Sequence, residues 1–228
     1  MQNIDERLSS VKQRIQNACL KAGRPINSIT LVGASKKQSS SLIAEFHKLG
    51  LSDVGENYLQ EAVDKREELK ALPLNWHFIG QIQSNKTKTI AENFRWVHGI
   101  DRLKIAKRLG QQNPQPGNPI NLLVQLNPDA EASKGGVSPD QAAELCMQIN
   151  DVKGVSIRGF MMIPKARDSF AEQKHVFEIA QEQLELTNQR YDLNLDSLSM
   201  GMSADLEAAI AAGSTIVRIG TDLFGARE

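Results

Sequence analysis

Short apolar runs alternate with amphipathic stretches along almost the whole chain, and no other feature constrains the fold as strongly. The run ITLVGAS at residues 29–35 is nearly all apolar, which is typical of a strand covered on both faces, and residues 40–49 then show helical spacing. The same unit recurs to give eight strand candidates, each followed by a helix candidate or by the end of the chain. Strict alternation of strands and helices predicts a parallel sheet.

The number of units indicates how this sheet closes. Eight strand–helix units in about 200 residues match the lower size limit of a closed barrel, and an open doubly wound sheet, which normally has fewer strands, is the alternative. The predicted fold is therefore α/β, a (β/α)8 TIM barrel, with residues 3–22 as an extra N-terminal helix and residues 1–228 as a single domain. The strand candidates are residues 29–35, 51–57, 75–80, 95–100, 120–127, 155–163, 195–200 and 214–220. The helix candidates that follow them are residues 40–49, 59–71, 86–93, 102–111, 139–150, 170–190 and 205–212.

The charge balance argues against a partner with a large charged surface. Lys and Arg number 27, and Asp and Glu number 27, whereas nucleic acids and anionic membranes are bound by basic surfaces. No run approaches the roughly 18 apolar residues of a membrane span, and the charged N-terminus lacks the apolar stretch of a signal peptide. Cys19 and Cys146 are too isolated to indicate a metal site or a disulfide framework. We therefore expect a cytoplasmic protein whose partner is a small molecule.

Two loops near the C-terminus carry the residues of a phosphate site. Barrels of this kind have their active sites at the carboxyl ends of the strands, and phosphate sites often use the loops after the seventh and eighth strands. Ser203 is a good N-cap for a helix over residues 205–212, whose backbone N–H groups favour an anion. Gly220 permits close approach, and the Thr221 hydroxyl can donate a hydrogen bond. The alternative is that Ser203 is only a cap and Gly220 only a turn, but their coincidence at these two loops favours a phosphate site.

Lys36 and Arg218 add two cations to the same end of the barrel. Lys36 ends a very apolar strand, so it is either an amine of lowered pKa in a partly dry pocket or an ammonium that reaches solvent. Arg218 lies among apolar neighbours in a covered strand and needs an acceptor, which a carboxylate could also supply. A lysine, a phosphate site and a buried arginine together suit pyridoxal 5′-phosphate (PLP), which needs a Schiff-base amine, an anion site and a partner for its pyridine nitrogen. A lysine aldolase acting on a phosphorylated sugar is an alternative on the same fold.

The four histidines give no comparable pattern. His77 stands between two aromatic residues and is predicted to be a hydrogen-bonded core residue. His47, His98 and His175 show no pairing with Cys, Asp or Ser that indicates a catalytic triad or a metal site. The short motifs of nucleotide-binding loops, zinc proteases and serine hydrolases are also absent from the sequence. We therefore predict no catalytic residue among them.

Motifs spread over nearly the whole chain resemble those of the pyridoxal phosphate homeostasis protein family, the single-domain relatives of the alanine racemase barrel. The stretch from MGMS to FGAR is the most specific of them. The matching segments are ASK at 34–36, GENY at 55–58, WHFIGQIQSNK at 76–86, IDR at 100–102, SKGG at 133–136, GFMMIP at 159–164, LSMGMSADLEAAIAAGST at 198–215 and VRIGTDLFGAR at 217–227.

The resemblance implies a complete PLP site. It implies that Lys36 carries PLP as a Schiff base and that Arg218 faces the pyridine nitrogen. An arginine in that place disfavours a protonated ring and so weakens carbanion chemistry. The other implied contacts are Ser203, Gly220 and Thr221 on the phosphate, backbone groups around Ser199 and Met202 beside them, and Asn57 near the ring.

The resemblance also implies a function in intracellular PLP homeostasis, in which the chain buffers PLP or supplies it without robust catalysis. Apo PLP-dependent enzymes are the candidate acceptors, and a PLP-dependent amino-acid racemase is the alternative function. Because the chain stops at Glu228, without the dimerising second domain of the racemases, a monomer is expected. Some relatives carry a second lysine where this chain has Gln38, and further lysines near the C-terminus, where it has GARE; Lys37 and Lys134 are the candidates to replace them in PLP transfer.

Overall fold

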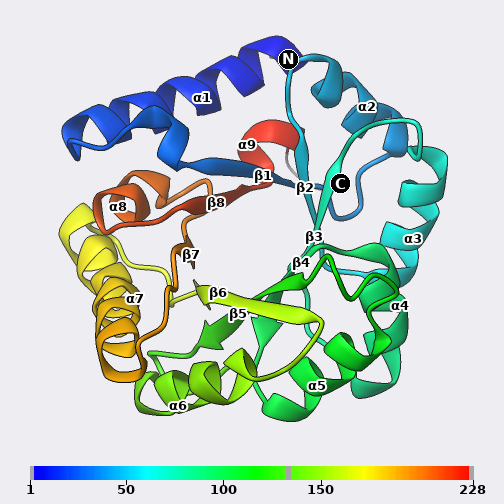
Figure 1. Ribbon diagram of the computed structural model, residues 1–228. Coiled ribbons are helices and arrows are strands. Elements are labelled where there is room, and N and C mark those ends of the chain that lie inside the picture. The colour runs from blue at the N-terminus through cyan, green and yellow to red at the C-terminus, as the bar shows by residue number, and fades with distance from the viewer. Residues whose placement is uncertain (1–2, 132–134, 226–228) are drawn as a thin grey trace.

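A closed barrel of eight parallel strands forms the centre of the molecule (Figure 1). The computed structural model describes residues 3–131 and 135–225, and within them each strand pairs with the next in chain order. The barrel closes where β8 pairs with β1, from Thr30 opposite Ile216 to Gly33 opposite Ile219. The predicted (β/α)8 barrel is therefore confirmed, and the open sheet is excluded. The strands are β1 (Thr30–Ala34), β2 (Asp53–Glu56), β3 (Asn75–Phe78), β4 (Trp96–Ile100), β5 (Ile120–Leu126), β6 (Val155–Met162), β7 (Ser197–Ser199) and β8 (Ile216–Ile219).

Helices surround the barrel, as Figure 1 shows in a view into its opening. The sequence did not predict the last of them, a single turn after β8, whereas the others agree with the predicted ranges to within about one turn. Among the described residues, no helix is both long and apolar enough to cross a membrane. The helices are α1 (Ile4–Lys21), α2 (Ser40–Lys48), α3 (Leu59–Glu68), α4 (Thr87–Asn93), α5 (Leu103–Gln112), α6 (Pro139–Asn150), α7 (Phe170–Tyr191), α8 (Leu206–Ala211) and α9 (Thr221–Phe224), with 3-10 turns η1 (Ile26–Ser28) and η2 (Ser84–Lys86).

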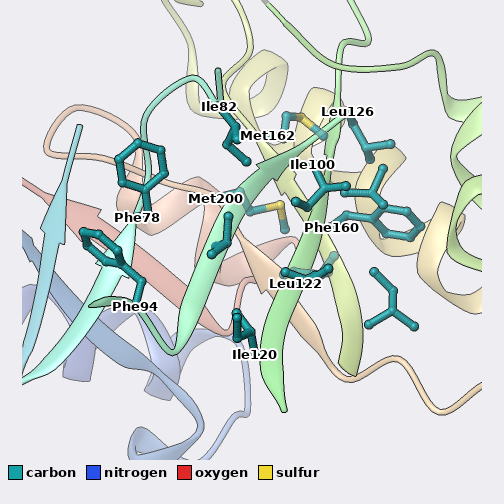
Figure 2. Packing of buried hydrophobic residues seen from close by; sticks show 14 of the residues in the cluster. Phe78, Ile82, Phe94, Ile100, Ile120, Leu122, Leu126, Phe160, Met162 and Met200 are labelled. Carbon is teal, nitrogen blue, oxygen red and sulfur yellow. The ribbon is translucent and has the colours of Figure 1, made fainter. Parts of the chain in front are cut away.

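The main apolar core fills the layer between the strands and the outer helices. Figure 2 shows part of it, with Phe78, Phe94, Ile100, Leu122 and Phe160 packed among one another. These strands carry apolar side chains on the face that the helices cover, which explains why their sequences read as nearly continuous apolar runs. Each such side chain contributes roughly 1.5–3 kcal/mol when it is fully removed from water.

The interior of the barrel is partly polar. Its apolar part is small and consists of Val32, Leu123, Met161 and Ile216. Polar side chains from β3, β4, β7 and β8 share the interior and are at most 4% exposed; they are His77, His98, Ser199 and Arg218. Buried polar groups need partners, so their hydrogen bonds determine much of what the site can do.

The extra N-terminal helix α1 lies beside α8 and α9 and extends the outer ring (Figure 1). Asn3 caps it, and Glu6 completes a capping box with the Asn3 main chain. Its buried face presents Leu8, Val11 and Ile15 to an apolar cluster shared with α8 and α9. The helix therefore covers the elements that follow β7 and β8.

Candidate functional site

A cavity of about 290 Å³ opens at the carboxyl end of the barrel. Residues that follow β1, β2, β3, β6, β7 and β8 line it. It collects seven of the residues predicted to bind the ligand, and Ser199, which is fully buried, is the one that does not line it. The seven are Lys36, Asn57, Met202, Ser203, Arg218, Gly220 and Thr221. Their contacts with a ligand stay a prediction, but their convergence on one cavity is a property of the fold.

Lys36 is half-buried in the loop after β1, and a buried salt bridge holds the residue before it. The Ser35 hydroxyl donates to Glu56 Oε1 at 2.5 Å, and Lys65 Nζ donates to the Ser35 main-chain oxygen at 2.8 Å. Lys65 and Glu56 also pair with each other at 2.7 Å, with side chains only 7% and 0% exposed. The loop that presents the Lys36 amine is thus fixed by charges in the protein interior.

The same cluster also holds the residue after Lys36. Lys65 Nζ contacts Glu61 Oε1 at 2.5 Å, and the Lys37 N–H donates to that oxygen at 2.5 Å. Burial raises the pKa of Glu56, although the hydrogen bonds from Lys65 and Ser35 oppose the shift. Glu56 Oε2 is buried without a hydrogen-bond partner among the described residues. Within the described part of the chain, Lys65 is therefore the one side chain that bonds to both carboxyl groups beneath the loop.

Ser203 does not cap α8, so the prediction that it does is wrong. The N-cap is Asp205, whose Oδ1 accepts from the Met202 N–H at 2.6 Å, because residues 202–205 form a turn before the helix. The Ser203 hydroxyl instead accepts from the Asp222 N–H at 3.3 Å. This contact places the hydroxyl beside the loop after β8, so the two loops of the predicted phosphate site meet through it.

Gly220 has no conformational need to be glycine. Its φ of −108° is open to any residue, and a Cβ built on it would meet only Ala34, at 3.5 Å or more. Gly201 differs, because its φ is +96° and a Cβ there would lie 2.6 Å from the Ala209 Cβ. The interpretation of Gly220 as a simple turn is therefore disfavoured, and the space in front of it belongs to the cavity.

Arg14 of the N-terminal helix bonds, from outside the barrel, to the segments that follow β7 and β8. Arg14 Nε donates to Glu207 Oε1 of α8 at 2.7 Å, and its Nη1 donates to Asp222 Oδ2 of α9 at 2.5 Å. Its Nη2 donates to the main-chain oxygen of Ser203 at 2.9 Å. The sequence analysis missed this residue, because an arginine on an amphipathic helix gives no signal that distinguishes it from a solvated surface charge.

Arg218 is 4% exposed and lines the cavity from β8. Its Nη1 donates to the main-chain and hydroxyl oxygens of Ser199, both at 2.6 Å, and its Nη2 donates to the Met162 oxygen at 3.0 Å. The acceptors are thus uncharged oxygens rather than the carboxylate that the sequence left open. Burial lowers the pKa of Arg218 to about 10, partly opposed by the charge of Asp205, so the guanidinium remains a cation at neutral pH.

Two histidines extend the contacts of Arg218 across the barrel. His98 Nδ1 lies 2.8 Å from the Ser199 hydroxyl, and its Nε2 lies 3.0 Å from His77 Nδ1. His77 Nε2 in turn lies 3.0 Å from Asp53 Oδ1. The contact between His98 and Ser199 left no sign in the sequence, because it joins residues 101 positions apart. His77 is a hydrogen-bonded core residue, as predicted.

The remaining lining residues define what chemistry the cavity can perform. Asn57 Oδ1 is buried without a hydrogen-bond partner among the described residues, so this oxygen can accept a hydrogen bond from a ligand in the cavity. Lys36 and Arg218 are the only described lining residues whose side chains carry charge. The arrangement therefore combines one amine, one permanent cation and two hydroxyls around a small volume.

Comparison with known proteins places this barrel in a known class. The sequence model of the family described as alanine racemase, N-terminal domain, matches residues 8–228. An alanine racemase from Clostridium difficile shares the fold, with a TM-score of 0.71 at 12% identity, over 95% of this chain and 56% of that chain. The fold and the lysine-bearing cavity thus define an alanine racemase-like barrel.

Similarity to curated proteins is much higher and identifies the family. The pyridoxal phosphate homeostasis protein of Pseudomonas aeruginosa is 48% identical over all of this chain and 97% of its own length, and that of Escherichia coli K12 is 43% identical over 100% and 98%. PipY of Synechococcus elongatus, in a structure with PLP bound, has a TM-score of 0.83 at 34% identity and covers 98% of this chain and 100% of its own. The chain belongs to the pyridoxal phosphate homeostasis protein family.

Proposed function

We propose that this chain binds PLP covalently on Lys36 and serves intracellular PLP homeostasis as a buffer or supplier of the cofactor. The observation that carries the proposal is the convergence of Lys36, Arg218, Ser203 and Thr221 on one cavity of about 290 Å³. When PLP is bound, its aldehyde condenses with the lysine amine to form a carbon–nitrogen double bond with loss of water. The names of the relatives and the PLP in the PipY structure support the same ligand.

The donor set fits PLP group by group. The Ser203 and Thr221 hydroxyls and the main chain at Gly220 suit a phosphate, and the bare glycine leaves room for its oxygens. Arg218 offers N–H donors for an unprotonated ring nitrogen. The unpartnered Asn57 Oδ1 suits a donor on the ligand, beside the ring. The Ser199 oxygens already accept from Arg218, so the predicted contact near Ser199 would come from main-chain N–H groups beside it.

The cavity favours a carrier over a racemase. Racemisation needs an acid and a base on opposite faces of the substrate, and Lys36 carries the only amine among the described lining residues. Arg218, with a pKa of about 10, stays a cation and disfavours a protonated ring. We therefore propose that the chain has no robust catalytic activity. Exchange of the α-hydrogen of an L-amino acid with D2O at enzyme-like rates, with formation of the D-isomer, would instead establish the racemase.

The proposal includes the setting in which the protein acts. Residues 1–228 form one PLP-binding domain, which acts as a monomer in the cytoplasm and passes PLP to apo enzymes. Gln38 lines the cavity where some relatives carry a second lysine, and Lys37 is exposed next to Lys36. Lys134, the other candidate for a transfer lysine, lies outside the described residues. Light scattering of the purified chain tests the monomer directly, since a dimer would double the expected mass.

The binding experiment uses equilibrium dialysis of the purified protein against PLP and against pyridoxal, which lacks the phosphate. The intact chain is expected to bind PLP with one site, and Lys36→Ala to bind it at least tenfold more weakly because the covalent bond is lost. Lys70→Ala, at an exposed lysine that does not line the cavity, is the matched control and should bind as the intact chain does. Absence of PLP binding by the intact chain contradicts the proposal.

The supply function needs a second experiment. The PLP-loaded protein is mixed with an apo PLP-dependent enzyme, and recovery of that enzyme's activity is compared with recovery from free PLP at the concentration that spontaneous release provides. Recovery faster than release allows supports direct supply. If the apo enzyme recovers activity only as fast as PLP is released into solution, the chain buffers PLP and does not pass it on directly.

A further inference from the structure

A continuous row of hydrogen-bonding groups crosses the barrel interior from the Lys36 cavity toward its opposite end. It begins at Arg218 and passes through the Ser199 hydroxyl, with heavy-atom distances of 2.6 and 2.8 Å on either side of that oxygen. It continues through His98 and His77 at 3.0 Å and ends 3.0 Å further on, at Asp53. Asp53 is the first residue of β2, at the amino end of the barrel, and its side chain is 21% exposed. We call these residues the relay.

The cavity end of the relay fixes the direction of its hydrogen bonds. An arginine can only donate, so the Ser199 oxygen accepts from Arg218. The Ser199 hydroxyl then donates its own proton to His98 Nδ1, at a distance of 2.8 Å between the two heavy atoms. If His98 donated instead, the serine oxygen would receive two donors and its own proton would have no acceptor in the relay. The neutral His98 ring must therefore carry its proton on Nε2.

The Asp53 end gives the same direction when Asp53 is a carboxylate and the His77 ring is neutral. An ionised carboxylate can only accept, so His77 carries its proton on Nε2, next to Asp53 Oδ1. A neutral His77 ring then offers Nδ1 as an acceptor, and His98 must donate to it from Nε2. Both ends thus require the same tautomer in both rings, and every proton in the relay points away from the cavity.

The surroundings keep the two rings in place and His98 neutral. Trp96 stacks on His77 with ring centroids 5.7 Å apart and meets His98 edge-on at 6.1 Å. His98 is fully buried, and this burial is the main cause that lowers its pKa well below the usual range, with the charge of Arg218 acting in the same direction. A neutral, single-tautomer His98 is the condition under which Ser199 accepts from Arg218 without competition.

We propose that Asp53, His77, His98 and Ser199 are positioning residues that act through Arg218 and set its affinity for the ring nitrogen of PLP. Arg218 has five N–H groups, and three of them bond to Ser199 and Met162, which leaves two toward other acceptors. Arg218 also lines the cavity, so a guanidinium held by Ser199 and Met162 can offer its remaining N–H groups to a ligand there in one fixed orientation. This inference rests on the proposed PLP site.

The first test reads the tautomers without any ligand. Long-range proton–nitrogen correlation spectra of the nitrogen-labelled protein report which ring nitrogen of each histidine is protonated. His98 and His77 are each expected to carry one proton, on Nε2, and the His98 signals are assigned by their loss in His98→Asn. A proton on His98 Nδ1 overturns the relay, whatever PLP does.

The second test separates the ring nitrogen from the phosphate. Dissociation constants are measured for PLP and for its analogue with CH in place of the ring nitrogen. The intact chain should prefer PLP by about tenfold, the size expected for one hydrogen bond to a charged group. His98→Leu removes the acceptor for Ser199, so the preference should fall toward one. His98→Asn, which keeps an acceptor oxygen near the position of Nδ1, should restore part of it, and the exposed His175→Leu should leave it unchanged.

The outcomes distinguish this inference from the proposed function. If the intact chain binds both ligands equally, or if His98→Leu keeps the full preference, the relay does not set the affinity for the ring nitrogen and the PLP site still stands. If the intact chain binds neither ligand, the proposed function itself fails. Should His98→Leu not fold, Ser199→Ala in place of it removes the contact with a smaller change of volume and carries the same expectation.

Discussion

The guanidinium of Arg14 donates a 2.9 Å hydrogen bond to the main-chain oxygen of Ser203, so the first helix of the chain is bonded directly to the loop that follows β7. The same side chain pairs with Glu207 and Asp222, which begin α8 and α9. Both loops of the candidate phosphate site are thus tied to α1 by one residue, and Figure 1 shows the three helices next to one another. The extra helix has a positioning function that its amphipathic pattern alone did not indicate.

Replacement of Arg14 tests this positioning. Arg14→Met should lower the free energy of unfolding by about 1 kcal/mol, because the ion pairs are a third exposed and screened. Its affinity for PLP should fall several-fold, while its affinity for pyridoxal, which has no phosphate, should hardly change. Arg24→Met is the matched control, since Arg24 follows α1 and its guanidinium donates to the Ile210 oxygen at the far end of α8. Equal losses for the two ligands would show that Arg14 does not act on the phosphate loops.

A methyl group at Gly220 tests whether that glycine serves the ligand or the fold. Because its φ is −108° and the nearest protein atom to a Cβ is 3.5 Å away, Gly220→Ala should change the free energy of unfolding by less than about 0.5 kcal/mol. The methyl group enters the cavity, so PLP affinity should fall by about tenfold or more. Gly201→Ala should show the opposite pattern, with little change in PLP affinity. It should lower the free energy of unfolding by about 1–3 kcal/mol, since Gly201 has a φ of +96° and a Cβ there would lie 2.6 Å from its nearest neighbour. Thermal unfolding and PLP titration of the two variants decide between the roles.

Replacement of one partner of the buried Lys65–Glu56 pair should strongly destabilise the fold. Lys65→Met leaves the Glu56 carboxylate, 0% exposed, without its cation and should lower the free energy of unfolding by about 3–5 kcal/mol. The double variant with Glu56→Gln should recover much of this loss, because no uncompensated charge remains. Lys70→Met, which removes an exposed partner of Glu67, should have almost no effect. Urea unfolding of these four proteins and of Glu56→Gln alone is the measurement, and losses that add up in the double variant would contradict the assigned pairing.

The stability of the chain should fall in mildly acidic solution because His98 resists protonation. Burial is the main cause that lowers the pKa of His98 well below its usual 6.5, and the charge of Arg218 acts in the same direction. Below about pH 6.5 the unfolded chain therefore binds a proton that the folded chain does not. The free energy of unfolding then decreases as the pH falls, by at most about 1.4 kcal/mol per unit from this group, and His98 adds no slope above pH 6.5.

Comparison of two proteins isolates this contribution. His98→Asn removes the titrating ring, so its stability should depend less on pH between 6.5 and 5 than that of the intact chain. Glu56, whose pKa is raised, acts in the opposite direction but is common to both proteins and cancels in the difference. Urea unfolding at pH 7, 6 and 5 measures the slopes, and parallel slopes would mean that His98 titrates normally in the folded chain.

The fold was predictable because its signal is local. Each strand is a short apolar run, each helix has its own period, and their strict order leaves few topologies. The cavity residues were predictable for the same reason, since the carboxyl ends of the strands must meet in a barrel. Lys36, Ser203 and Gly220 could thus be brought together without any knowledge of register.

What the sequence could not predict depends on register and on tertiary contact. His98 meets Ser199 across the barrel, and His77 meets Asp53 on a neighbouring strand, at sequence separations of 101 and 24 residues. The N-cap of α8 was misplaced because residues 202–205 form a turn, so the helix begins two residues later than a serine cap would place it, although Asp205 makes no side-chain capping bond. α9 is too short to show a helical period.

The attachment of PLP to Lys36 is the central claim, and the most direct measurement is borohydride reduction of the PLP-treated protein followed by peptide mass spectrometry. Borohydride converts the carbon–nitrogen double bond into a stable amine, so the modified lysine can be identified. The account predicts that the pyridoxyl group is found on the peptide that contains Lys36, and that Lys36→Ala carries none at equal PLP concentration. Labelling of other lysines with Lys36 unmodified, or equal labelling of Lys36→Ala, would contradict it.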